Sequence, residues 1–583
     1  MGVSTRPRPD DQLVAPADAT RTPLPSWSRW PPRLSTLGRW TLIAVLLLLV
    51  VYPLVWLLIR GLQGPDGSVA VNKFFETFTR PDVHEALVNS LSVNVPATLL
   101  AGAIGSFLAW AVSRTDVPGR GALDKLVVVP FITMTLVGSF AWVVLAAPRT
   151  GLLNVTVFNH IGVTLNIYST PGQIFVMTVY FMPFVYLLTS RALRRVDPAL
   201  EDAAVICGRP RWTASLRVML PLVAPAILAA LILTFAMTME EFGVFAILAA
   251  PQGDYVLTTL IWRYMNTFPA DYTSASALAC LLLALTGLVV VIQRRVMGSR
   301  RSFVVIGGRE YRPGGIELRG GGKALLTTVC WGYVTVSVIL PVLGLLTVSM
   351  YSVYTAELTT TGLGLANWRR LIEDGSVMQA ARNSTVLSLG AALVALTLTT
   401  VAAYMIHRRS TRGKGLILFL TTVPVAVPGV VLAVGVFQAY IHPPLVLYGT
   451  IWILFVAYVT RHLPYGMRSV EASLEQLHEN LEQSAAIAGA SGFRVLRTIV
   501  LPLLAPGMVA GFSIMFIAMF RELSSSVLLY SSGNVVNSVL MLEMYGQGNN
   551  GELAALALTL TVATIAFLAV IQRLTHVNLT HRG

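Results

Sequence analysis

Long apolar blocks separated by short polar stretches fill most of this 583-residue chain. A helix needs about 20 apolar residues to cross the hydrocarbon core of a bilayer, and the first block of that kind runs from Trp40 to Ile59. Eleven more blocks follow, at approximately 90–113, 126–147, 173–192, 222–248, 273–293, 324–350, 384–406, 415–440, 446–467, 503–530 and 553–572. The pattern predicts an all-α polytopic membrane protein with about 12 transmembrane helices.

Composition and charge agree with this class. The chain is 55% hydrophobic and 12% charged, and its formal net charge is +14. If the N-terminus is cytoplasmic and the spans alternate, most Lys and Arg residues fall in cytoplasmic segments, which is the positive-inside bias of membrane proteins. We therefore expect a multi-pass protein of the prokaryotic cytoplasmic (inner) membrane, embedded in the lipid bilayer with both termini cytoplasmic. The charge requires no nucleic-acid partner.

A sequence repeat relates the two ends of the chain. Val196 to Leu228 and Leu477 to Val509 are identical at ten of thirty-three positions, at a constant offset of 281. Arg114 recurs as Arg408 at an offset of 294. The first half of the chain therefore holds about thirteen extra residues between Arg114 and Val196, and we place them in the outer loop 148–172.

The repeat predicts two halves of six spans each. Both halves then start on the same side of the membrane, so we expect them to be parallel and pseudo-symmetric, with a pathway between them. Asn89-Ser90 before the second span recurs as Asn383-Ser384 before the eighth. The expected segments are a disordered basic cytoplasmic tail at 1–38, a first half at 39–293, a cytoplasmic linker at 294–323 and a second half at 324–583.

The most similar part of the repeat is a polar, basic loop between spans four and five of each half. In the first copy, LEDAAVI at Leu200–Ile206 predicts a short amphipathic helix with Glu201 and Asp202 toward solvent. Gly208 follows, where glycine commonly ends a helix. A polar loop repeated at the same place in both halves indicates a repeated docking site.

This loop resembles the cytoplasmic loop of permease subunits in binding-protein-dependent ABC importers. That family carries Glu-Ala-Ala, three residues, Gly and, further on, Leu-Pro. The first copy matches this pattern at Asp202, Ala203, Ala204, Gly208 and Leu220-Pro221. The second copy matches it less closely, at Gln483, Ser484, Ala485, Gly489 and Leu501-Pro502.

The resemblance implies a type I ABC importer permease fold and a set of partners. One chain would work with two copies of an ABC ATPase subunit and one extracytoplasmic solute-binding protein. No Walker A sequence, G-x-x-x-x-G-K-[ST], occurs in the chain, so we expect no bound cofactor and no enzyme activity, with ATP used by the partner subunits. The residues implied to couple to the ATPase are Glu201, Asp202, Ala203, Ala204, Gly208, Glu482, Gln483, Ser484, Ala485 and Gly489.

Charged residues inside a span are costly and mark functional sites, and four of them lie at matching positions of the two halves. Glu240 and Glu241 fall late in the fifth span, and Arg521 and Glu522 occupy the same positions of the eleventh, at the offset of 281. They are candidates for the translocation pathway or its gate, with Arg521 pairing a carboxylate. The alternative is a static salt bridge that holds the halves together.

The prediction of the cargo rests on weaker sequence signals. Glu241 to Gly243 resembles a stretch of permeases for iron(III), molybdate, sulfate and thiamine. The outer-loop RTGLLN and the NSL and NST stretches resemble the iron(III) type of importer permease. Thiamine, 2-aminoethylphosphonate and polyamines are the alternative cargoes. An alternative of a different class is an ion-gradient-driven secondary transporter, with Ser113 to Gly121 as a loose approximation of its signature loop. We predict no catalytic residues and no metal site, and the three Cys residues have no assigned role.

Overall fold

The computed structural model describes residues 32–63, 68–69, 71–197, 199–208, 210–299, 316, 318, 320–351, 363–408 and 413–575. Within these ranges the fold is all-helical, as predicted, and nine helices are long and apolar enough to cross a membrane, or up to twelve if three bent pairs each count as one span. Most of the predicted tail, most of the predicted linker and the last eight residues lie outside the described residues.

The two halves repeat helix by helix. Helices α4 (Pro81–Arg114) and α19 (Gly375–Arg408) have 34 residues each and start 294 residues apart. Helices α12 (Leu220–Met239) and α25 (Leu501–Phe520) have 20 residues each and start 281 residues apart. Further pairs are α9 (Thr170–Arg195) with α22 (Ile451–Glu475), α14 (Leu257–Asn266) with α27 (Asn537–Gly546), and α15 (Tyr272–Ser299) with α28 (Asn550–Thr575).

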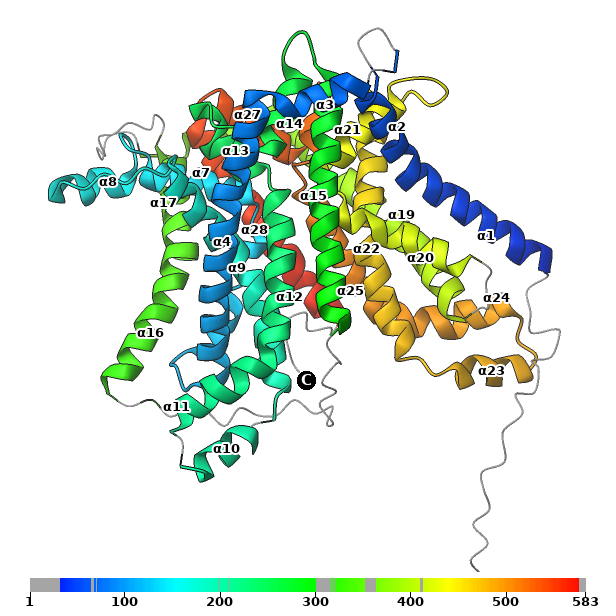
Figure 1. Cartoon of the computed structure of the whole chain (residues 1–583), viewed down its shortest axis with the longest axis horizontal. Helices are drawn as coiled ribbons and strands as arrows, with labels where there is room; N and C mark the ends of the chain where they lie inside the picture. The colour runs from blue at the N-terminus through cyan, green and yellow to red at the C-terminus, as the bar shows by residue number, and fades with distance from the viewer. Residues whose placement is uncertain are drawn as a thin grey trace, which may run out of the picture.

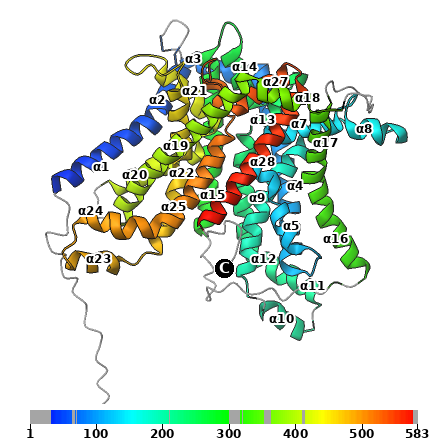
Figure 2. The same cartoon turned by 180° about the vertical axis from the view of Figure 1, so that it is seen from behind.

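The change of offset from 294 to 281 occurs in the outer loop for which it was predicted. The segment 147–169 between α7 (Thr135–Ala146) and α9 has 23 residues, whereas the segment 441–450 between α21 (Gly429–Tyr440) and α22 has 10. The thirteen additional residues include α8 (Leu152–Thr156), which projects from the side of the bundle in Figures 1 and 2.

The first helix of each half packs against the other half. Helix α2 (Tyr52–Gly61) continues α1 (Pro32–Leu46) and packs on α15 and on α21 of the second half. Helix α17 (Leu340–Met350) continues α16 (Gly321–Val334) and packs on α28 and on α7 of the first half. The outer helices therefore lock the two halves together, and one contiguous apolar core extends through both.

Two predicted spans are sharply bent. The predicted span 126–147 consists of α5 (Arg120–Leu126), α6 (Val129–Ile132) and α7, with a bend of 98°, and 415–440 consists of α20 (Lys414–Thr422), a 3-10 turn and α21, with a bend of 115°. The backbone is extended at Met134 and at Val427, just before α7 and α21. Val427 precedes Pro428, and a residue before proline disfavours the helical conformation.

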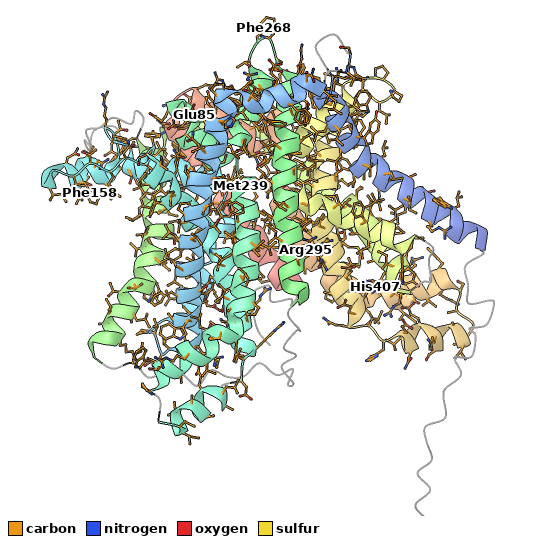
Figure 3. The ribbon with its side chains drawn as sticks, in the orientation of Figure 1. Glu85, Phe158, Met239, Phe268, Arg295 and His407 are labelled. Carbon is orange, nitrogen blue, oxygen red and sulfur yellow. The ribbon has the colours of Figure 1, made fainter. Side chains whose placement is uncertain are left out.

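The predicted fifth and eleventh spans are interrupted at their charged residues. Helix α12 ends at Met239, and α13 (Gly243–Leu248) starts after a break of three residues, Glu240–Phe242. Helix α25 ends at Phe520, and α26 (Ser526–Leu529) starts after Arg521–Ser525. We call these two breaks the elbows. Met239, at the start of the first elbow, is labelled midway along the bundle in Figure 3.

The repeated Asn-Ser pairs hold equivalent helix ends. The Asn89 side chain donates to the carbonyl of Tyr255 at 3.2 Å, and the Ser90 hydroxyl accepts from the Leu257 N–H at the start of α14 at 3.0 Å. In the second half, Asn383 donates to Val535 at 3.0 Å, and Ser384 accepts from the Asn537 N–H at the start of α27 at 2.8 Å. Each long helix, α4 or α19, is thus attached at its upper end in Figure 1 to the second helix after the elbow, α14 or α27.

Candidate functional site

A cavity of about 300 Å³ lies between the halves at the elbows. Its lining comes from α7, α9 and α12 of the first half and from α22 and α25 of the second, together with both elbows. All four charged residues that the sequence singled out inside spans line it: Glu240, Glu241, Arg521 and Glu522. Residues from two predicted spans of different halves therefore meet at one place.

Arg461 on α22 connects the carboxylates of the two halves. Its Nη2 atom lies 3.4 Å from Glu240 Oε2, and its Nε atom lies 3.1 Å from Glu522 Oε2. The Glu522 side chain is 8% exposed and that of Glu240 is 28% exposed, so Glu240 is the more accessible partner. A Cβ atom on Gly429, the first residue of α21, would come within 2.0 Å of Arg461 Nη1. Glycine at that position gives the guanidinium its space.

Arg521 makes different contacts from those predicted. Its Nη1 atom donates to the main-chain carbonyls of Phe131 at 2.6 Å and Ile132 at 3.0 Å, and its guanidinium carbon lies 6.0 Å from the centre of the Phe131 ring. No carboxylate of the described residues lies within ion-pair distance of it. The prediction that Arg521 pairs a carboxylate is therefore wrong, because the C-terminal carbonyls of α6 reach this guanidinium and Arg461 holds the acidic groups.

Glu241 and Glu522 play equivalent local roles. Glu241 Oε1 accepts from the Val244 N–H at 3.2 Å and from the Thr135 hydroxyl at 2.7 Å. Glu522 Oε1 accepts from the N–H and the hydroxyl of Ser525, each at 3.0 Å. A carboxylate at a helix N-terminus satisfies free N–H groups and suits the helix dipole. Each elbow is thus fixed by its own glutamate.

The two halves contribute unequal side chains to the cavity. At the offset of 281, Arg461 and His462 of α22 correspond to Tyr180 and Phe181 of α9, and all four line the cavity. His462 is buried, with Nδ1 2.9 Å from the carbonyl of Tyr458. Arg461 was not among the predicted site residues, although an arginine inside a predicted span is the same signal that marked Arg521.

A second cavity of about 370 Å³ is lined by residues of α13, α14 and α27, helices that lie at the upper end of the bundle in Figure 1. It is lined by aromatic residues of both halves, Phe242, Tyr255, Trp262, Tyr530 and Tyr545, and by Glu543. Phe242 faces this cavity, whereas its neighbours Glu241 and Gly243 line the charged one. The elbows therefore separate an aromatic chamber from a charged chamber.

The repeated loops form short helices at the lower end of the bundle in Figure 1. Helix α10 (Ala199–Ile206) is followed by Gly208 at φ +85°, and α23 (Glu479–Ile487) is followed by Gly489 at φ +87°. Both glycines adopt the left-handed conformation that ends a helix. Pro198 lies outside the described residues.

The orientation of α10 differs from the predicted one. Glu201 is 6% exposed and faces the bundle, whereas Leu200 is exposed. Asp202 is exposed as predicted. In the second loop Leu481, Gln483 and Ser484 are exposed. The Glu201 carboxylate lies near enough to the Arg114 guanidinium at the end of α4 to interact electrostatically, and an apolar side chain, Leu200, faces outward.

Among the described residues there is no group of three or more His, Cys, Asp or Glu side chains that could hold a metal ion. Cys207 is exposed, Cys330 is buried and Cys280 is intermediate, and all three are free thiols. Charges of both signs are buried at helix breaks between two pseudo-equivalent halves. This arrangement suits the passage of a solute more than the catalysis of a reaction.

The fold and the paired loops define a membrane-embedded permease. The chain belongs to the family of binding-protein-dependent transport system inner membrane components, which it matches over residues 101–302 and 395–577. The protein is thus the multi-pass inner-membrane component of an ABC importer, is not itself an ATPase, and works with separate ATP-hydrolysing subunits. This membership decides between the two classes of transporter that the sequence left open.

Two similar proteins cover most of the chain. A putative ferric transport system permease protein of Haemophilus influenzae is 27% identical over 507 residues, 84% of this chain and 78% of its own length. A ferric transport system permease protein of Actinobacillus pleuropneumoniae is 26% identical over 521 residues, 86% of this chain and 74% of its own length. A crystal structure of a bacterial alginate ABC transporter has 20% identity and a TM-score of 0.40, covering 46% of this chain and 95% of that one.

Proposed function

We propose that the cargo of this permease is iron(III), delivered by an extracytoplasmic solute-binding protein and released into the cytoplasm. The observation that carries the proposal is the similarity to two ferric transport permeases over 84% and 86% of the chain. The charged cavity supports it, because three carboxylates there face two guanidinium groups. An excess of negative charge favours a cation and disfavours an anionic cargo such as a phosphonate.

The two loop helices are the proposed contacts with the ATPase subunits, one copy on each. Exposed apolar side chains on helices that project from the bundle suit protein docking. They are Leu200 and Ile206 on α10, and Leu481 and Ile487 on α23. In this assignment the lower end of the bundle in Figure 1, where α10 and α23 lie, is cytoplasmic. The proposal includes cytoplasmic N- and C-termini. ATP-driven closure of the two ATPase subunits then brings α10 and α23 together.

The charged cavity is the proposed passage, and the elbows are its gate. Arg461 belongs to the second half, and it pairs both with Glu240 of the first half and with Glu522 of its own half. When the halves rock, the contact between Arg461 and Glu240 is the one that must change. That contact is also the longer of the two, which suits a bond that opens and closes.

The test is uptake of radioactive iron(III) into proteoliposomes that contain this chain, its two ATPase subunits and its binding protein. We expect uptake that requires ATP and the iron-loaded binding protein, and that falls at least tenfold in Glu240→Gln. Thiamine, spermidine and 2-aminoethylphosphonate are supplied in parallel. ATP-dependent uptake of one of these without uptake of iron would replace the proposed cargo and leave the transporter class intact.

A further inference from the structure

Two arginines occupy equivalent positions at the lower ends of the long helices. Arg114 is the last residue of α4, and Arg408 is the last residue of α19. Arg114 is almost completely buried, and the side chain of Arg408 is largely buried. The sequence repeat pairs them, but neither contributes to the cavity.

Both arginines hold the end of the neighbouring span. Arg114 Nη2 donates to the carbonyls of Leu193 at 2.5 Å and Val196 at 3.0 Å. Arg408 Nη2 donates to the carbonyls of Leu474, at 3.2 Å, and Leu477. These carbonyls lie at the C-terminal ends of α9 and α22, directly before α10 and α23. A guanidinium at a helix C-terminus satisfies its free carbonyls and suits its dipole.

In the second half the same arginine also holds the loop helix itself. Arg408 Nη1 lies 3.2 Å from Glu479 Oε1, and Arg408 Nε lies 3.0 Å from Glu482 Oε1. The Tyr404 hydroxyl, one turn earlier on α19, donates to Glu482 Oε2 at 3.2 Å. His407, labelled in Figure 3, marks this end of α19 beside the loop helices. Helix α23 is therefore bound to α19 through its acidic first turn.

The first half has the weaker form of this connection. Glu201 is the equivalent of Glu482, faces inward and lies near enough to Arg114 to interact electrostatically. No ion pair within 4.0 Å joins Glu201 to Arg114 among the described residues. Only one of the two loop helices thus has direct ion pairs to its arginine.

The opposite ends of α4 and α19 reach the elbow region. Ser90 and Ser384 each accept from the first N–H of the second helix after an elbow, α14 or α27. Helix α19 therefore contacts α23 at one end and α27 at the other, whereas α4 contacts the chain directly before α10 at one end and α14 at the other. This is a continuous mechanical connection from the ATPase side to the gate.

We propose that Arg114 and Arg408 are positioning residues that make α4 and α19 move with α10 and α23, and that Glu482 holds α23 inward instead of binding the ATPase. The inference rests on the proposed coupling role of the two loops. Arginine is suited to the task because its planar fork bonds several oxygens in fixed directions. Lysine would keep the charge but lose the simultaneous contacts with carbonyls and carboxylates.

The experiment measures motion without any cargo. Arg195→Cys, the last residue of α9, and Gln476→Cys, its exposed equivalent after α22, receive spin labels in the full complex with both ATPase subunits. Cys207 and Cys280 are first replaced by alanine to remove accessible thiols. In the unsubstituted background, trapping with ATP and vanadate should shorten the distance between the labels.

The variants Arg408→Met and Arg408→Lys should keep the ATPase bound but lose most of this shortening, and binding-protein-dependent transport per ATP hydrolysed should fall at least tenfold. Glu482→Gln should give an intermediate loss. The matched control is Arg468→Met, because Arg468 is an exposed arginine on α22 that does not contact the loop helix. It should retain the full shortening.

Full shortening and unchanged transport per ATP in both Arg408 variants would overturn the proposal. A parallel loss of assembly and transport in Arg408→Met, with normal coupling in Arg408→Lys and Glu482→Gln, would also overturn it, because the arginine would then be only structural. If the unsubstituted complex itself shows no vanadate-dependent shortening, the coupling role of α10 and α23 is refuted, and this inference with it.

Discussion

The ion pairs of Arg461 give a stability prediction that is independent of transport. Arg461→Met removes the guanidinium that lies 3.4 Å from Glu240 and 3.1 Å from Glu522. Removing one partner of a buried ion pair typically costs about 3–5 kcal/mol, because it leaves a buried charge uncompensated. The Glu240 side chain is 28% exposed into the cavity, where water screens it. We therefore expect about 3 kcal/mol, roughly a 150-fold change in the unfolding equilibrium constant.

The assay is equilibrium unfolding of the purified permease in mixed micelles, followed by tryptophan fluorescence. Arg468→Met is the control, since that side chain is 77% exposed and lies 3.7 Å from Glu471; an exposed pair should contribute less than about 1 kcal/mol. Adding Glu522→Gln to Arg461→Met should recover part of the loss, because it removes the most buried unpaired carboxylate. Equal unfolding free energies for Arg461→Met and Arg468→Met, or no recovery in the double variant, would refute the reasoning.

Two further predictions concern a glycine and an exposed ion pair. In the same unfolding assay, Gly429→Ala should destabilise the protein by about 1–3 kcal/mol, because the added Cβ would overlap Arg461. The control is Gly287→Ala on α15, where a Cβ meets open space. This control variant should be neutral or stabilised by up to about 1 kcal/mol. Lys323 donates to Asp116 at 2.6 Å and holds the pKa of that carboxyl below its usual value. The contact therefore stabilises the fold at neutral pH and is lost as the pH falls through the lowered pKa. In the same unfolding assay, Lys323→Met should be less stable than the unsubstituted protein at neutral pH, and this difference should disappear as the pH falls through that range.

The class of fold was predictable because hydropathy and the repeat act over long stretches of sequence. Twenty-residue apolar blocks have few alternatives to spanning a membrane, as each unpaired backbone group in lipid is costly. The bends at Met134 and Val427 were not predicted, because a bent span and a straight one have the same apolar composition. Their cause is local backbone geometry, which the apolar pattern does not contain.

The candidate site was predictable in part for a similar reason. Glu240, Glu241, Arg521 and Glu522 stand out as charges in apolar surroundings, and all four line one cavity. Which acid pairs with which base depends on how α22 packs against the elbows, and only the three-dimensional arrangement brings Arg461 to Glu240.

The inward turn of Glu201 shows a second limit. Helical periodicity places an acidic residue toward water by default. Here the Glu201 side chain is buried and lies near the Arg114 guanidinium at the end of α4, while Leu200 and Ile206 face outward. That arginine lies 87 residues earlier in the sequence, beyond the reach of a local pattern.

The difference between Arg461 in one half and Tyr180 in the other bears on how such a permease assembles. Two copies of the first half would place carboxylates of both elbows together without this arginine, and two copies of the second half would place two such arginines at one cavity. Separate subunits would need a recognition surface to avoid these pairings. Joining the halves in one polypeptide gives each a partner of the other kind at high effective concentration, so synthesis itself fixes the stoichiometry, and the two sides of the cavity are free to diverge.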